Sequence, residues 1–192
     1  EPERVSENEY GVSWSAYHEN YHNFMMVAYD NSGTVGGLYT NQDMISSQSD
    51  LTMGDSKESV HETLGEPEEV IQSGTFNYQV SNQNEYDVYQ MDENQTTIFY
   101  DVHQENSVTA VQIIDENLQA EKDGIYTQSS ESLREGLEYQ LFDLTNAARI
   151  KHDLQPLEWH EEVSETARKH SADMAENEYF NHTNLEGQSP FD

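Results

Sequence analysis

The sequence has no cysteine among its 192 residues, so disulfide bonds, cysteine-ligated zinc and thiol catalysis are excluded. Basic residues are scarce: eight Lys and Arg face 38 Asp and Glu, the formal net charge is −30, and the basic residues form no cluster. Such a chain repels phosphate backbones and anionic lipids, which disfavours binding to nucleic acids or to a membrane surface. The apolar runs are only a few residues long, too short to insert across a bilayer.

Apolar side chains are also few, at 34% of the chain, below the roughly 45–50% of an average globular domain. Twelve Tyr, two Trp and six Met compensate in part, because aromatic side chains bury a large area each. These numbers indicate a folded protein with a small core and a strongly solvated surface. We expect the acidity to favour solubility at high salt or high pH. The start of the sequence has no charged and apolar leader, so we expect any export signal to lie outside it.

The N-terminal part of the chain alternates in short segments that are typical of β-strands. The residues up to Gly11 are polar, and we expect a loose end there. One helix interrupts the strands: Asp55 is placed to cap it, with Glu58 three residues on, and Gly65 and Pro67 end it. The strands are expected at 14–17, 24–29, 34–39, 75–80, 86–91, 97–102 and 108–114.

A weak internal repeat runs through these strands. An offset of 73 residues places Met25 on Ile98 and Val35 on Val108, and segment 14–17 corresponds to 76–79. The helix precedes the second copy but not the first, so we favour a chain that begins partway through its first unit. We predict an antiparallel sheet in which residues 14–39 and 76–114 superpose, with the helix packed on one copy.

From Ser130 onwards the hydrophobic period changes to 3.6 residues, which indicates helices. One apolar stripe comprises Leu133, Leu137, Leu141, Leu144 and Ala148, and a second comprises Val163, Ala167, His170 and Met174. Residues 119–130 are polar and contain Gly124, which is typical of a linker. Because wet apolar stripes are costly, we expect these helices to pack on each other and on the N-terminal sheet, or on a second copy of the chain.

Five blocks near the C-terminus resemble a known family. They are LFDLTNAAR (141–149), LQPLEW (154–159), ARKHSADMA (167–175), YFNHT (179–183) and GQSPFD (187–192). In this order they resemble the opening of a CAP domain, from the superfamily of cysteine-rich secretory, antigen 5 and pathogenesis-related proteins, and especially its bacterial branch. Residues 11–117 resemble the CAP-associated N-terminal domain of exported Gram-positive proteins, through the helix end LGEP (64–67) and the paired strand units.

The resemblance implies an α+β fold. An antiparallel, strand-rich repeat domain with a short helix would be followed by the first helices of an incomplete α-β-α CAP sandwich. We place the CAP-associated domain at 1–118, a linker at 119–130 and the truncated CAP domain at 131–192. The resemblance also implies an exported protein, either secreted or held on the extracellular side of the cell wall or membrane.

A complete CAP domain gathers two His and two acidic residues in a cavity that can hold a divalent metal such as zinc. The resemblance makes His182, in the Phe-x-His block, the counterpart of the first of these His residues. The Gly-Glu-Asn and His-x-x-Asn motifs that carry further cavity residues would lie beyond Asp192. A stable metal site needs three or four ligands. In this chain we therefore expect His182 to be a loop residue and no cofactor to bind.

Other candidate residues favour structural roles. His170 lies on the apolar stripe of its helix, which favours a core or boundary position. His18 and His22 are four residues apart on an expected strand, about 13 Å, too far to share one metal, and we expect both at the surface. The many carboxylates form no evident catalytic pair. The segment from Asp30 departs from a calcium loop at two required positions.

The sequence is compatible with three functions. The leading interpretation is an exported or envelope-associated recognition module without catalysis in this chain, whose partner is a protein, a cell-wall component or a small molecule. The first alternative is a hydrolase of peptide, lipid or cell-wall material, with a CAP cavity completed beyond Asp192. The second is a scaffold that pairs with another chain through its strand edges. A complete His and Glu cavity would favour the hydrolase, and a co-purifying partner would favour the scaffold.

Overall fold

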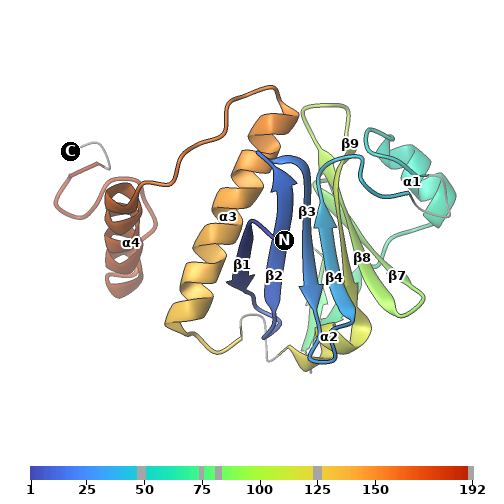
Figure 1. Cartoon of the computed structure of the whole chain (residues 1–192), viewed down its shortest axis with the longest axis horizontal. Helices are drawn as coiled ribbons and strands as arrows, with labels where there is room; N and C mark the ends of the chain where they lie inside the picture. The colour runs from blue at the N-terminus through green and yellow to red at the C-terminus, as the bar shows by residue number, and fades with distance from the viewer. Residues whose placement is uncertain (47–50, 74–75, 81–83, 123–126, 190–192) are drawn as a thin grey trace. The chain divides into compact units, whose positions relative to one another are not determined.

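The computed structural model describes residues 1–46, 51–73, 76–80, 84–122 and 127–189 (Figure 1). These residues fall into two compact units, Glu1–Pro156 and Leu157–Asp192. Each unit is a separate body with its own internal contacts.

A seven-stranded antiparallel sheet forms the first unit, with the strand order β1-β2-β3-β4-β9-β8-β7. The strands are β1 (Arg4–Glu7), β2 (Ser13–Glu19), β3 (His22–Tyr29), β4 (Val35–Thr40), β7 (Tyr86–Met91), β8 (Asn94–Asp101) and β9 (Ser107–Asp115). A separate two-stranded sheet consists of β5 (Val70–Ser73) and β6 (Phe76–Gln79). The helices are α1 (Lys57–Leu64), α2 (Glu116–Glu121) and α3 (Glu131–Lys151). The α+β fold with an antiparallel, strand-rich N-terminal part confirms the prediction.

The predicted repeat is present as two sets of three consecutive strands, β2-β3-β4 and β7-β8-β9. Each set has a register shift at the same point, after which Tyr29 pairs with Val35 and Tyr100 pairs with Val108. Val35 and Val108 are 73 residues apart, as predicted, whereas Tyr29 and Tyr100 are 71 apart. Segment 14–17 corresponds to β7 rather than to 76–79, because β6 belongs to the separate hairpin. That part of the repeat prediction was wrong.

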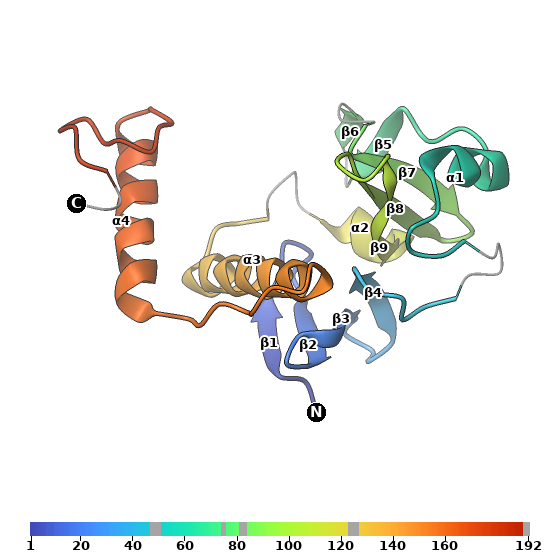
Figure 2. The same cartoon turned by 90° about the horizontal axis from the view of Figure 1, so that it is seen from above.

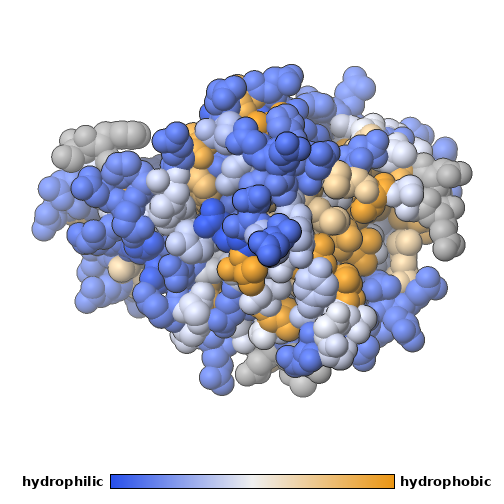
Figure 3. Space-filling view, in the orientation of Figure 1, coloured by the Kyte–Doolittle hydropathy of each residue, from blue (hydrophilic) through white to orange (hydrophobic). Residues whose placement is uncertain are grey.

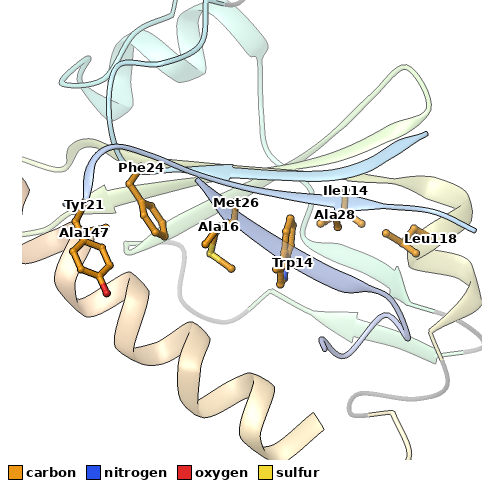
Figure 4. Packing of buried hydrophobic residues seen from close by; sticks show 9 residues of the cluster. All are labelled: Trp14, Ala16, Tyr21, Phe24, Met26, Ala28, Ile114, Leu118 and Ala147. Carbon is orange, nitrogen blue, oxygen red and sulfur yellow. The ribbon is translucent and has the colours of Figure 1, made fainter. Parts of the chain in front are cut away.

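Successive side chains of a strand point to opposite faces of the sheet, and apolar residues on both faces form a core. On the first, which we call the α3 face, Trp14, Phe24 and Met26 point toward the helix side (Figure 4). On the other, the α1 face, Val60 of α1 packs with a cluster from β7, β8 and β9: Tyr89, Ile98, Tyr100 and Val108. Seen from above, α2 and α3 lie on one side of the sheet and α1 on the other (Figure 2).

The two cores leave part of the sheet thinly covered. Leu38, Val111 and Ile113 of β4 and β9 are only half-buried. Hydrophobic side chains gather over these two strands at the molecular surface (Figure 3). A close contact fixes the opposite side of β4, where a Cβ on Gly37 would lie 2.8 Å from the Trp14 ring. Glycine at this position lets the indole lie flat against the sheet.

Helix α1 begins one residue later than predicted. Ser56, not Asp55, caps it: the Ser56 hydroxyl accepts from the backbone N–H of Ser59 at 3.2 Å. The Asp55 carboxylate instead accepts from the N–H of Thr52 at 2.7 Å and holds the preceding turn. The predicted end is confirmed, since Gly65 follows the helix with a φ of 85°.

Helix α3 packs on β1 with a face that the hydrophobic pattern did not indicate. Of the predicted stripe only Leu133 is buried, whereas Leu137 and Leu141 are 42% and 69% exposed and Ala148 is exposed. The buried positions of the helix are Leu133, Gly136, Gln140, Asp143, Asn146 and Ala147. The physical reason is that this face offers a close backbone approach at a glycine and polar groups that find partners on the sheet.

Two further expectations were wrong. The N-terminus is not a loose end, because β1 pairs with β2, with Val5 opposite Ser15. The first residues of the predicted linker are helical: α2 follows β9 directly, and the Asp115 carboxylate caps it by accepting from two backbone N–H groups. Gly124 lies outside the described residues.

The second unit consists of α4 (Glu161–Glu176) and the segment that follows it. No residue of α4 is buried, and Val163 of the predicted stripe is 65% exposed. Ion pairs at 2.8 Å join Arg168 to Glu161 and Lys169 to Glu165. In this unit the helix surface is organised by charge rather than by an apolar core.

Candidate functional site

A groove of about 840 Å³ lies between α3 and the α3 face of the sheet. Strand pairing builds its floor, because Met26, Tyr39 and Gln112 stand opposite one another on β3, β4 and β9. Trp14, Phe99 and Ala110 complete the floor. The volume is within the range of about 300–1,000 Å³ that is usual for ligand sites.

Helix α3 supplies the wall of this groove through its leucines. Leu133, Leu137, Leu141 and Leu144 all line it. Leu137 and Leu141 are exposed because they turn toward the groove and the solvent rather than toward β1. The stripe that the sequence analysis assigned to a core is therefore the apolar wall of an open groove.

Polar and charged side chains also line the groove. Burial raises the pKa of Tyr39 to about 12, so its hydroxyl stays protonated at neutral pH. The Lys122 ammonium stands 5.0 Å from the centroid of the Tyr10 ring, and burial lowers the pKa of Lys122. The charged lining residues are Glu9, Glu85, Asp101, His103 and Lys122.

A buried carboxylate holds the wall in place. Asp143 of α3 is 2% exposed and accepts from Arg4 Nε at 2.9 Å and from the Tyr21 hydroxyl at 3.0 Å. Gln140 Nε2 donates to the backbone oxygen of Glu7 at 2.7 Å. The polar face of α3 thus attaches the helix to β1 and leaves Leu137 and Leu141 free for the groove.

His18 supports this attachment from β2. Its ring stacks on that of Tyr21 at 4.1 Å, and its Nδ1 accepts from the Tyr21 backbone N–H at 3.0 Å. Burial lowers the pKa of His18, which keeps the imidazole neutral and Nδ1 able to accept. The prediction that His18 and His22 share one strand was wrong, because the chain turns between them and His22 begins β3.

A second buried carboxylate, on the α1 face, was missed by the sequence analysis. Asp87 is fully buried and its two oxygens accept from Lys57 Nζ at 3.0 Å, from the Tyr100 hydroxyl at 2.9 Å and from His61 Nε2 at 2.7 Å. Burial, followed by the carboxylate of Asp87, raises the pKa of Tyr100. An Asp at an inward position of an otherwise apolar strand was the available signal. The contacts identify a structural anchor for α1.

The residue singled out for metal binding lies in the second unit. His182 is exposed on the segment after α4, and the residues that the structure describes include no group of three His, Asp or Glu placed to hold a metal ion. His170 occupies a boundary position, with Nε2 2.8 Å from the backbone oxygen of Asn181. It lines a cavity of about 980 Å³ within this unit together with Val163, Ala167 and Leu185.

We predict that this chain binds no divalent metal tightly through His182. One imidazole on an exposed segment supplies one ligand, whereas a stable zinc site takes three or four. A calorimetric titration with zinc should give no strong site. A single strong site that disappears in His182→Ala would contradict the prediction.

Comparisons with known proteins give a family match for each of the two parts of the chain. Residues 1–124 match the CAP-associated N-terminal family and residues 142–192 match the cysteine-rich secretory protein family, CAP. In Bacillus subtilis, the uncharacterized membrane protein YlbC is 53% identical over 45 residues, and the uncharacterized protein YkwD is 41% identical over 66 residues. The matched stretches cover 23% and 34% of this chain, but only 13% and 26% of those relatives. None of the described helices is long and apolar enough to cross a membrane.

Solved structures show the same fold. An extracellular protein with an SCP domain from Bacillus anthracis superposes with a TM-score of 0.77 at 20% identity, covering 100% of this chain and 67% of that one. A cysteine-rich secretory protein from Staphylococcus aureus gives a TM-score of 0.68 at 12% identity, covering 92% of this chain and 61% of that one. With these matches the chain belongs to the CAP-associated N-terminal family, and residues 142–192 match the CAP family.

Proposed function

We propose that the first unit is a recognition module of an exported, cell-envelope-associated protein, and that it binds an apolar ligand in the groove beside α3. The observation that carries this proposal is the combination of an apolar floor with an apolar wall that remains open. Leu137 and Leu141 stay exposed on the wall although the sheet lies beside them. Exposed apolar surface of this kind marks an interaction site in a soluble protein.

The way in which helix α3 is attached to the sheet supports the same proposal. The fold buries Gln140, Asp143 and Asn146 of α3 and leaves Leu137 and Leu141 exposed. This arrangement sacrifices hydrophobic burial, which is the usual source of helix packing energy. An apolar ligand in the groove would recover part of that burial. Two similar proteins, the extracellular protein of Bacillus anthracis and the membrane protein YlbC, support an export location.

The neutral apolar dye N-phenyl-1-naphthylamine tests this proposal. Trp159→Phe leaves Trp14, in the groove floor, as the only tryptophan. Dye binding should be saturable and should quench Trp14 fluorescence. In that background Leu137→Gln should weaken dye binding about tenfold, since a leucine contact is worth about 1.5–3 kcal/mol when fully buried.

The matched control is Leu154→Gln. Leu154 belongs to the same unit, is 50% exposed and does not line the groove, so its replacement should leave dye affinity unchanged. Absence of saturable quenching, or equal losses in the two variants, would overturn the proposed function.

A further inference from the structure

One side chain in the groove floor has hydrogen-bonding capacity that the described part of the fold does not use. Gln112 of β9 is half-buried and lines the groove, with Tyr39 beside it on β4. Within the described residues its side-chain amide makes no hydrogen bond. The amide of Gln140, in contrast, is already committed to the backbone of Glu7.

The Gln112 amide limits the kinds of ligand that can bind in the groove. A glutamine side chain offers two N–H donors and a carbonyl acceptor. A ligand that buried Gln112 without pairing it would pay the desolvation cost of those groups. A plain aliphatic chain would leave them unpaired, whereas a polypeptide backbone presents one C=O and one N–H at each residue. The chemistry of the floor therefore favours a peptide whose side chains are apolar.

The charge of the protein further limits which ligands can occupy the groove. The chain carries −30, so an anionic ligand and a second copy of the chain are both repelled at long range. Around the groove, three carboxylates, on Glu9, Glu85 and Asp101, outnumber the cationic Lys122 and the titratable His103. A positively charged segment is attracted both by the whole molecule and by this rim.

We propose that the occupant of the groove is a polypeptide segment with apolar side chains and net positive charge, whose backbone hydrogen-bonds to the Gln112 amide. This inference rests on the proposed function, because it names the ligand class of the same groove. It adds to that proposal a residue that determines specificity, Gln112, and the sign of the ligand's charge, which is positive.

Displacement of the dye tests the inference on the Trp159→Phe protein in 0.15 M NaCl. The competitors are a capped eight-residue alternating Leu-Lys peptide, its Leu-Glu counterpart, and dodecanol as a neutral aliphatic chain. The Leu-Lys peptide should displace the dye, and the Leu-Glu peptide should do so at least tenfold less well. Because displacement reports only on the groove, adsorption of lysines elsewhere on the acidic surface does not count as binding.

Gln112→Leu separates a peptide from an aliphatic ligand. The variant should bind the dye as well as or better than the parent protein, yet bind the Leu-Lys peptide about five- to tenfold more weakly. Gln95→Leu is the matched control, since Gln95 is a half-buried residue on the neighbouring strand β8 that does not line the groove. It should leave both affinities unchanged.

Several outcomes would overturn the inference while the proposed function stands. These are dye binding with displacement by dodecanol alone, equal displacement by the two peptides, or equal Leu-Lys affinity in Gln112→Leu and the parent. If the dye itself does not bind, the proposed function fails instead.

Discussion

Replacing Asp87 by asparagine is expected to lower the free energy of unfolding of the first unit by about 3–5 kcal/mol, the usual cost of breaking a buried ion pair. The carboxylate is fully buried and accepts from Lys57, His61 and Tyr100. An amide keeps one acceptor oxygen and turns the other position into a donor, so at least one of these donors faces an N–H group. Urea unfolding followed by Trp14 fluorescence in the Trp159→Phe background measures the change.

Asp43→Asn is the control for this prediction. Asp43 lies in the same unit, but it is exposed, so its replacement should change the free energy of unfolding by less than about 0.5 kcal/mol. Lys57→Met should cost less than Asp87→Asn, because Lys57 is partly exposed and the carboxylate keeps two donors. If Asp87→Asn behaves like Asp43→Asn, the cluster does not anchor α1.

Replacing Gly136 by alanine is expected to detach α3 from β1. A Cβ at this position would stand 2.2 Å from the backbone oxygen of Glu7 and 3.0 Å from its backbone nitrogen. The added Cβ would clash with backbone atoms of Glu7, so no side-chain rotation relieves the clash. Overpacking of this kind costs about 1–3 kcal/mol or more. The sign of the change in the free energy of unfolding tests the contact, because Gly→Ala within a free helix stabilises the helix by about 1 kcal/mol.

Hydrogen exchange measures this detachment directly. Amides of β1 and α3 should exchange at least tenfold faster in Gly136→Ala, and dye affinity should fall because α3 is the wall of the groove. Thr145→Ala, on the exposed side of the same helix, should leave both unchanged. Stabilisation of the unit by Gly136→Ala would show that α3 does not rest on Glu7.

The sequence by itself determined the strands other than β1 and β5, the antiparallel pairing and the end of α1, because these depend on local alternation and on residues such as Gly65 that favour one backbone conformation. It also determined the family, since the CAP blocks are contiguous in the chain. The offset between Val35 and Val108 was readable for the same reason, as equivalent strands keep equivalent apolar positions.

Only the tertiary structure decided which face of α3 is buried and what the buried carboxylates do. Periodicity predicts that the most apolar face of a helix is buried, but Gly136 gives another face of α3 a closer approach to the sheet. On that face Gln140 and Asp143 make three hydrogen bonds, two to β1 and one to Tyr21 in the turn before β3. Lys57, Asp87 and Tyr100 meet across separate elements. The energy of such contacts depends on long-range geometry and burial, which no local pattern encodes. The groove, with the Gln112 amide on its floor, follows from the same packing of α3 on the sheet.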